Sequence, residues 1–293
     1  MGWGLLAPSL LLPAQAQDPT PTATPSGPPP PASLFAQAQW KLDNQDWRGA
    51  VADLSQVIEL DEAAEMDAAI GDLIQARLHR GMAYSGLGDS TKAMSDWTWV
   101  IEISSPPSES GETASSSSEP APASPSPEDF SAAIALAHHN RGILFLQQGD
   151  PETALVDFDQ AIDWDPQRAS SYVQRGLAHA ALENFAELLN DANAALERDP
   201  DLALAHQLRG IARYHLGDSE GSLTDFDRAI EQNPEAGSAY QNRGIVYRDL
   251  KQTEQAIADL IEARERLVSQ DYDRYQTVIH QLAPLQAEQA EGS

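Results

Sequence analysis

Apolar and polar positions alternate at helical spacing along much of the chain, and the pattern repeats every 34 residues. Glycine stands at positions 142, 176, 210 and 244, and an arginine precedes each of these glycines. We number every repeat so that this glycine is position 8, and we call equivalent positions a column. Column 24 is mostly bulky and contains Leu54, Trp97, Phe158, Ala192, Phe226 and Leu260. Columns 20, 24 and 27 lie on one stripe of a helix, which predicts an amphipathic helix in the second half of each repeat.

Each repeat is predicted to fold as two antiparallel helices joined by a short turn. Small residues at columns 8 and 20 let the two helices approach closely, and the bulky group at column 24 fills the space one turn further on. Leu188 at column 20 and Ala192 at column 24 exchange these volumes in one repeat, which indicates compensation. The turns contain Gly149-Asp150-Pro151 or a serine version of it, in which Gly ends one helix and Asp caps the next.

By this period and these columns the sequence resembles the tetratricopeptide repeat family. The resemblance implies an all-α fold, an α-solenoid of about six helix pairs with a capping helix at its C-terminal end. The repeats begin near Pro31, Ile74, Ala135, Ala169, Ala203 and Gly237. A longer helix from about Ala64 to Leu87 is predicted in the second repeat. Beyond the last repeat, a helical stripe of Tyr272, Tyr275, Ile279 and Leu282 predicts the capping helix.

Composition divides the chain into folded and linker segments. Residues 1–16 carry no charge and end in Ala14-Gln15-Ala16, the small-x-small pattern of a signal-peptidase site, so we expect a secretory signal rather than a disordered apolar leader. Its apolar run is shorter than the roughly 20 residues that span a bilayer. The remaining expected segments are a Pro/Thr-rich linker (17–32), repeats one and two (33–103), a disordered Ser/Pro-rich insert (104–128), repeats three to six (129–268), the capping helix (269–286) and a tail (287–293).

Charge restricts the partners. The formal net charge is -27, so nucleic acid and anionic membrane surfaces are not expected as partners, and no transmembrane segment remains after removal of the signal. The chain has no cysteine, which excludes disulfides and thiolate chemistry. We expect an exported protein, in the periplasm or another extracytoplasmic compartment.

The arginine before each glycine has a matching carboxylate. Column 7 contains Arg80, Arg141, Arg175, Arg209 and Arg243, and column 23 contains Asp96, Asp157, Asp191, Asp225 and Asp259. In an antiparallel helix pair these columns lie at one height, beside the buried stripe. A row of arginines could bind an acidic ligand, but the regular partner column favours a structural Arg–Asp ladder that joins helices.

The first helix of each repeat is expected to line a concave groove, as it does in proteins that this sequence resembles. The residues assigned to the groove are His139, Asn140, Ile143, Gln174, Leu177, Gln207, Ile211, Tyr214, Gln241, Asn242 and Ile245. The resemblance implies that Asn140 and Asn242, in column 6, bond to the backbone of a bound peptide. The alternative is that these amides only bridge adjacent helices. Ile143, Leu177, Ile211 and Ile245 are expected to form an open apolar row.

Motifs for catalysis are not found in the sequence: there is no G-x-S-x-G, H-E-x-x-H, P-loop or G-x-G-x-x-G. We therefore expect no enzyme, cofactor, metal site or small-molecule substrate. The predicted function is an exported adaptor or scaffold that binds a protein or peptide segment in its groove, for complex assembly. The alternative is a structural repeat protein that associates with itself.

Overall fold

The computed structural model describes residues 33–63, 70–104, 130–268 and 271–292. Within these ranges the chain forms thirteen α-helices and no strand, which confirms the predicted all-α repeat fold. The predicted signal, the Pro/Thr-rich linker, almost all of the Ser/Pro-rich insert and the start of the predicted long helix (64–69) lie outside the described residues. Among the described residues, 33–145 with 156–166 form one compact unit and 146–155 with 167–292 form a second.

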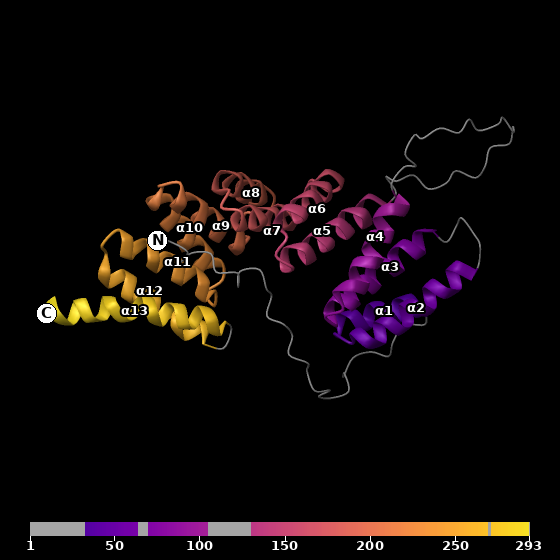
Figure 1. The fold of residues 1–293 in the computed structure, drawn as a ribbon, viewed down its shortest axis with the longest axis horizontal. Helices are drawn as coiled ribbons and strands as arrows, with labels where there is room; N and C mark the ends of the chain where they lie inside the picture. Colours follow the sequence, from indigo (N-terminus) through magenta and orange to yellow (C-terminus); the bar gives the residue numbers. More distant parts are fainter. Residues whose placement is uncertain (1–32, 64–69, 105–129, 269–270, 293) are drawn as a thin grey trace. The chain divides into compact units, whose positions relative to one another are not determined.

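The first unit contains the helices of repeats one and two and most of repeat three (Figure 1). Their bounds are α1 Leu34–Asp43, α2 Trp47–Ala63, α3 Ile70–Gly86, α4 Ser90–Ser104, α5 Ser131–Gln147 and α6 Pro151–Trp164. Ile74 and Leu78 of α3, Trp97 and Val100 of α4, and Ala137 of α5 share one buried apolar cluster. Helices α3, α4 and α5 are thereby joined through their apolar stripes.

The second unit contains repeats four to six and the terminal helix (Figure 1). Its helices are α7 Ala169–Ala181, α8 Phe185–Arg198, α9 Ala203–His215, α10 Ser219–Gln232, α11 Gly237–Asp249, α12 Thr253–Leu267 and α13 Tyr272–Gly292. Each first helix packs against the second helix of its own repeat, and consecutive first helices also touch: α7 contacts α9, and α9 contacts α11.

Glycine at column 8 is required by close helix packing. A Cβ built on Gly210 would lie 2.8 Å from Cε1 of Phe226, and one on Gly142 would lie 2.7 Å from Cε1 of Phe158. In repeat four the nearest atom to such a Cβ is Cδ1 of Leu188, at 3.2 Å from Gly176. Leu188 at column 20 therefore occupies the place beside glycine that the aromatic ring at column 24 takes in the other two repeats.

The turns between the two helices of a repeat place column 15 in the left-handed region. Gly88, Gly149 and Gly217 have φ of 76°, 78° and 90°, whereas Gln45, Glu183 and Lys251 adopt φ of 59°, 59° and 60° without being glycine. The aspartate that follows the glycine caps the second helix: Oδ1 of Asp218 accepts a hydrogen bond from the backbone N–H of Gly221 at 2.9 Å. The left-handed residues that are not glycine carry the ordinary steric cost of that conformation.

The terminal helix α13 covers the last repeat, as predicted. Leu282 and Tyr275 of the predicted stripe belong to the apolar cluster of the last repeat, whereas Tyr272 and Ile279 are not part of it. Val278, Leu282 and Leu285 are buried against Leu260 and Leu267 of α12, whereas Tyr272 is 67% exposed. The helix also continues to Gly292, where the sequence predicted a separate tail from residue 287. Tyr272 lies exposed in the first turn of the helix, and Val278 occupies the buried place that was predicted for Ile279.

Candidate partner-binding site

Each arginine of column 7 forms a bidentate ion pair with the aspartate sixteen residues later in its own repeat. Arg80 donates from Nε and Nη2 to Asp96 at 2.8 and 2.7 Å, and Arg243 donates in the same way to Asp259 at 2.8 and 2.7 Å. The equivalent pairs are Arg141–Asp157, Arg175–Asp191 and Arg209–Asp225. The aspartates are buried, so each guanidinium holds the first and second helices of its repeat together.

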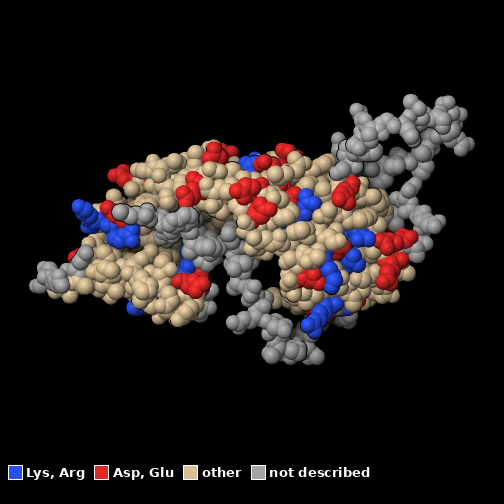
Figure 2. Space-filling view, in the orientation of Figure 1, with Lys and Arg blue, Asp and Glu red and all other residues tan. Residues whose placement is uncertain are grey.

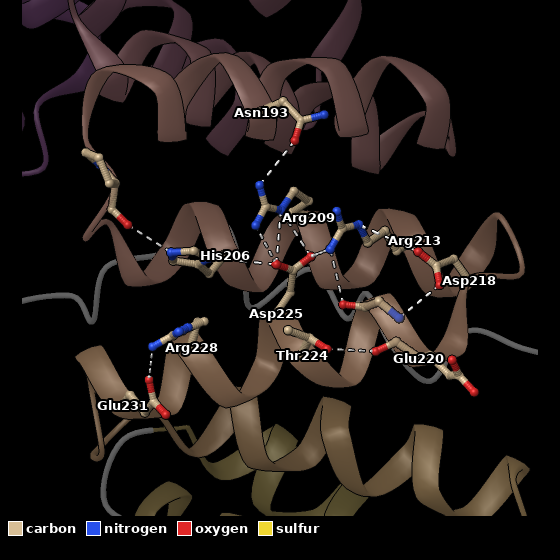
Figure 3. Close-up of polar contacts among 12 residues, drawn as sticks. Asn193, His206, Arg209, Arg213, Asp218, Glu220, Thr224, Asp225, Arg228 and Glu231 are labelled. Atoms are coloured by element: carbon tan, nitrogen blue, oxygen red, sulfur yellow. Dashed lines mark hydrogen bonds and ion pairs between the residues drawn. The ribbon is translucent and has the colours of Figure 1, made fainter.

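The third guanidinium nitrogen, Nη1, reaches the preceding repeat, a contact that the sequence interpretation missed. It donates to residues of column 25, namely Ser55 at 3.2 Å from Arg80, Thr98 at 3.1 Å from Arg141, Asn193 at 3.3 Å from Arg209 and Asp227 at 2.6 Å from Arg243. Figure 3 shows Arg209 lying between Asp225 and Asn193. The sequence does contain a pattern that predicts this contact, because column 25 is polar in every repeat except the last, where it is Ile261.

Column 4 provides a second contact to each pair. His138 Nδ1 lies 2.9 Å from Asp157, and Arg77 Nη1 lies 3.4 Å from Asp96. In repeats four and six this column is tyrosine instead, and each tyrosine ring contacts two guanidinium groups: Tyr172 those of Arg175 and Arg198, Tyr240 those of Arg243 and Arg266. The arginines of column 7 are thus engaged on several sides within the repeats.

Burial and partners set the pKa of these carboxyl groups in opposite directions. Burial tends to raise the pKa of Asp157, but hydrogen bonds from Arg141 and His138 outweigh it and hold the pKa below its ordinary value. For Asp259 burial wins, and its pKa is raised although Arg243 acts to lower it. Column 4 of this repeat is Tyr240 instead of a histidine, and Asp227 and Glu262 add negative charge near Asp259. Two pairs of one geometry therefore respond differently to pH.

The residues assigned to the groove divide into a buried and a partly exposed set. His139, Leu177, Gln207, Ile211, Gln241, Asn242 and Ile245 are buried, whereas Asn140, Ile143, Gln174 and Tyr214 are half-buried. The expectation of an open apolar row is wrong for Leu177, Ile211 and Ile245, which are 5, 0 and 3% exposed. The physical reason is that column 9 faces the neighbouring first helix, and consecutive first helices are in contact.

Several amide atoms of the assigned residues are buried and form no hydrogen bond within the part of the chain that the structure describes. They are Nδ2 of Asn140, Nε2 of Gln207, and both Nδ2 and Oδ1 of Asn242. Asn242 is 1% exposed. The alternative in which the column 6 amides bridge adjacent helices therefore finds no support at Asn242 among the described residues. Gln207 and Gln241 do bridge helices, because Oε1 of Gln207 accepts from Ser238 at 3.2 Å, and Gln241 contacts Gln281 of α13 at 3.3 Å.

Tyr214 lies on the same face of α9 and is bonded to the next first helix. Its hydroxyl donates to Oδ2 of Asp249 at the end of α11. Burial, followed by this hydrogen bond, raises the pKa of Tyr214 to about 12, so the phenol stays protonated at neutral pH. Next to it His215 stacks on Phe185, with ring centroids 3.8 Å apart. Burial lowers the pKa of His215, which favours its neutral form.

Charge is almost missing from the groove columns of α7, α9 and α11. Among columns 2, 5, 6, 9, 12 and 13 of these helices, only Arg248, Asp249 and His215 can carry charge near neutral pH. Arg248 and Asp249 form an ion pair at 2.7 Å, and the lowered pKa of His215 favours its neutral form. Across the described ranges, no group of three or more His, Asp or Glu residues could hold a metal ion. None of the helices that the structure describes is long and apolar enough to cross a membrane.

Comparison with known proteins identifies the repeats. Models of the tetratricopeptide repeat match residues 139–203, 173–236 and 226–258. NADPH oxidase activator 1 of Rattus norvegicus is 38% identical over 63 residues, which are 22% of this chain and 14% of that protein. The chain therefore matches only a small part of that relative.

Solved structures share the fold at low sequence identity. A tetratricopeptide repeat protein from Parabacteroides merdae has a TM-score of 0.56 and 16% identity, covering 86% of this chain and 91% of its own. MamA has a TM-score of 0.51 and 16% identity over 67% of this chain and 93% of its own. YrrB, a tetratricopeptide repeat protein with an unusual peptide-binding site, has a TM-score of 0.50 and 17% identity over 70% of this chain and 89% of its own. Residues 139–258 are thus tetratricopeptide repeats, a fold that typically mediates protein–protein interactions.

Proposed function

We propose that this protein is an adaptor that binds a protein or peptide segment on the groove face of α7, α9 and α11. The observation that carries the proposal is Asn242, which is 1% exposed and has no hydrogen-bond partner at either amide atom among the described residues. A buried polar group without a partner costs about 1–3 kcal/mol. A ligand that supplies one donor and one acceptor would remove that cost.

The surroundings of Asn242 fit the backbone of a bound segment. Ser238 lies one turn before Asn242 on the same face of α11, and its hydroxyl bonds to Gln207 of α9. Nε2 of Gln207 and the amide of Asn242, which have no hydrogen-bond partner among the described residues, therefore lie on two helices that are in contact. Together they offer two donors and one acceptor, which match the C=O and N–H groups of an extended chain.

The lack of charge favours backbone recognition over recognition of a charged terminus. The groove columns of these helices contain no lysine, and their one arginine is paired with Asp249. A carboxylate would find no free cation there. Because Asn242 is buried, binding requires side-chain rearrangement on α11, as is common at protein interfaces. The half-buried Gln174 and Tyr214 provide the accessible part of the same face.

The test is to replace Asn242 by alanine and to compare the proteins captured by the variant and by the wild-type chain. We expect the wild-type partner to be lost, while the melting temperature stays constant or rises, because an unsatisfied polar group has been removed. Asn193→Ala is the matched control: Asn193 bonds to Arg209, so this change should lower stability and leave binding intact. Retained binding by Asn242→Ala at wild-type strength would contradict the proposal. A large fall in its melting temperature would show that the amide is structural.

We also propose that the adaptor acts outside the cytoplasm. The support is the uncharged apolar stretch that ends in Ala14-Gln15-Ala16. N-terminal sequencing of the protein from its native cell should then begin at Gln17. An intact leader on the native protein would refute export through this signal.

A further inference from the structure

We propose that ionic strength controls the stability of the second unit, because its positive charges are held between helices while its negative charges face the solvent. Among the described residues of this unit, fifteen Asp and Glu residues are exposed, but only two cations are, Arg228 and Lys251. The other ten arginines of the unit are half-buried or buried. The proposal concerns the outer surface of the unit and does not depend on the proposed function.

The arginines of this unit are withdrawn from the surface because they bond to groups inside it. The arginine of column 7 in each repeat pairs with a buried aspartate. Arg198 donates to the carbonyl oxygen of Ala194 at 2.6 Å, and Arg266 donates to the carbonyl oxygen of Pro234 at 2.7 Å. A tyrosine ring lies against each of these two guanidinium groups. Little positive charge is therefore left to balance the carboxylates at the surface.

Column 29 shows the outward placement of the carboxylates. It is acidic in all six repeats and exposed in each of them: Glu59, Glu102, Asp163, Glu197, Glu231 and Glu265. The last three lie in the final turns of α8, α10 and α12, where the helix dipole is negative and disfavours a further negative charge. Figure 2 shows more Asp and Glu than Lys and Arg on the visible side of α8 and α10. The second helices thus present a predominantly acidic surface.

The second helices of consecutive repeats are close enough for their charges to interact at low salt. Helices α8 and α10 both pack against α9, and α10 and α12 both pack against α11. The axes of packed helices are about 8–10 Å apart, so two helices on a common neighbour are at most about 20 Å apart. The Debye length is about 30 Å at 0.01 M salt and about 10 Å at 0.1 M. Repulsion between consecutive repeats should therefore act at the lower concentration and be largely screened at the higher one.

Salt also weakens the attraction between opposite charges, but this effect is the smaller one here. Asp191, Asp225 and Asp259 are buried, so salt screens their ion pairs much less than it screens exposed charges. The exposed pair of Arg228 and Glu231 contributes little to stability at any salt concentration. In the expanded unfolded chain the carboxylates lie farther apart, so screening stabilises that state less. The folded second unit should therefore gain stability as the salt concentration rises.

Thermal unfolding of the full chain at neutral pH, in NaCl at about 0.01 M, about 0.1 M and about 0.5 M, gives the first test. We expect the melting temperature to rise by at least about 4 °C between the first two concentrations and to change much less between the last two. A melting temperature that falls or stays constant between the first two would overturn the proposal. A rise that occurs only above about 0.1 M would also overturn it, because it would reflect exclusion of salt from the protein surface instead of screening.

Substitutions at column 22 separate surface charge from other effects of salt. Asn190, Thr224 and Ala258 are exposed on α8, α10 and α12. One variant has lysine at all three positions, a second has glutamate, and the matched control has glutamine, which are three residues of similar helix propensity. At the lowest salt concentration the lysine variant should melt above the control and the glutamate variant below it, and the three should converge as salt rises. Equal melting temperatures at the lowest salt concentration, or the reverse order, would overturn the proposal.

Discussion

Arg243 connects three helices through one side chain, because it bonds to Asp259 of α12 and also to Asp227 of α10. Removal of one partner of a buried ion pair is strongly destabilising, since the other charge remains buried. Arg243→Ala should therefore reduce the free energy of unfolding by about 2–4 kcal/mol in urea titrations. Arg228→Ala is the control, because Arg228 and Glu231 are both about 60% exposed, and its effect should stay below about 1 kcal/mol. Equal effects of the two changes would show that burial of the pair does not matter.

The loss of stability caused by Arg243→Ala should depend on pH. The folded pKa of Asp259 is raised, so the native state holds this proton more tightly than the unfolded state. The contribution of Asp259 to stability therefore falls as pH rises from its ordinary pKa of about 3.9 through its folded pKa. Without Arg243 the folded pKa rises further, and the destabilisation should be larger at pH 7 than at pH 5. Urea titrations at both values measure it, and a loss of stability that is the same at both would contradict the raised pKa.

At the level of a helix pair, the glycine of column 8 has different neighbours in different repeats. A Cβ at position 210 would meet the rigid ring of Phe226 at 2.8 Å, whereas one at position 176 would meet the flexible end of Leu188 at 3.2 Å. Overpacking against a fixed ring typically costs about 1–3 kcal/mol. Gly210→Ala should thus lower stability by that amount.

Gly176→Ala is the matched change. Replacement of a mid-helix glycine by alanine gains up to about 1 kcal/mol of helix propensity, which offsets a small shift of Leu188. We expect its stability to be close to wild type. The double variant Gly210→Ala with Phe226→Leu should recover part of the loss. If thermal unfolding shows equal losses for Gly210→Ala and Gly176→Ala, the contact with Phe226 is not the cause.

The helix pairs and their glycines could be predicted because they depend on neighbours at a fixed sequence distance. The same 34-residue period placed Gly210 opposite Phe226 and Arg209 opposite Asp225. The burial of Ile211 could not be predicted in this way, because it depends on how closely one repeat approaches the next. The burial of Val278 in place of Ile279 could not be predicted for a related reason: α13 lies outside the 34-residue columns, so the column pattern does not determine which of its residues face inward. The sequence also could not predict that both amide atoms of Asn242 are without a partner, because Asn140 and Asn242 begin the same four-residue segment, Asn-Arg-Gly-Ile.

At the scale of the whole molecule, α13 closes the apolar core of the last repeat. It covers Ile257, Leu260 and Leu267, which are at most 8% exposed. In a repeat protein each unit is stabilised mainly by its neighbours, so removal of the end affects the adjacent repeat first. A chain that ends after Val268 should show faster hydrogen exchange in α11 and α12, while α3 and α4 stay protected.

The milder variant Leu282→Ala keeps the helix and removes part of its buried surface. It should accelerate exchange in the same two helices by a smaller factor, consistent with a loss of about 2–5 kcal/mol. Unchanged protection of α11 and α12 in both chains would show that the last repeat does not need α13. Faster exchange everywhere would indicate that the described helices unfold as a single cooperative unit.

The third nitrogen of the column 7 guanidinium also bears on how such a chain can change in length during evolution. Inside a repeat, the bidentate bonds join a guanidinium to a carboxylate that is almost completely buried, so a break there isolates a charge. Between repeats, Nη1 meets Ser55, Thr98, Asn193 or Asp227, four different side chains that all make the same contact. The Nη1 contact between repeats thus forms with neutral and acidic side chains alike. Water can solvate both the Nη1 group and its partner if the contact is broken. Among the contacts of this guanidinium, gain or loss of a whole repeat by duplication or deletion therefore breaks only the tolerant Nη1 contact, and the pairing inside each repeat is preserved.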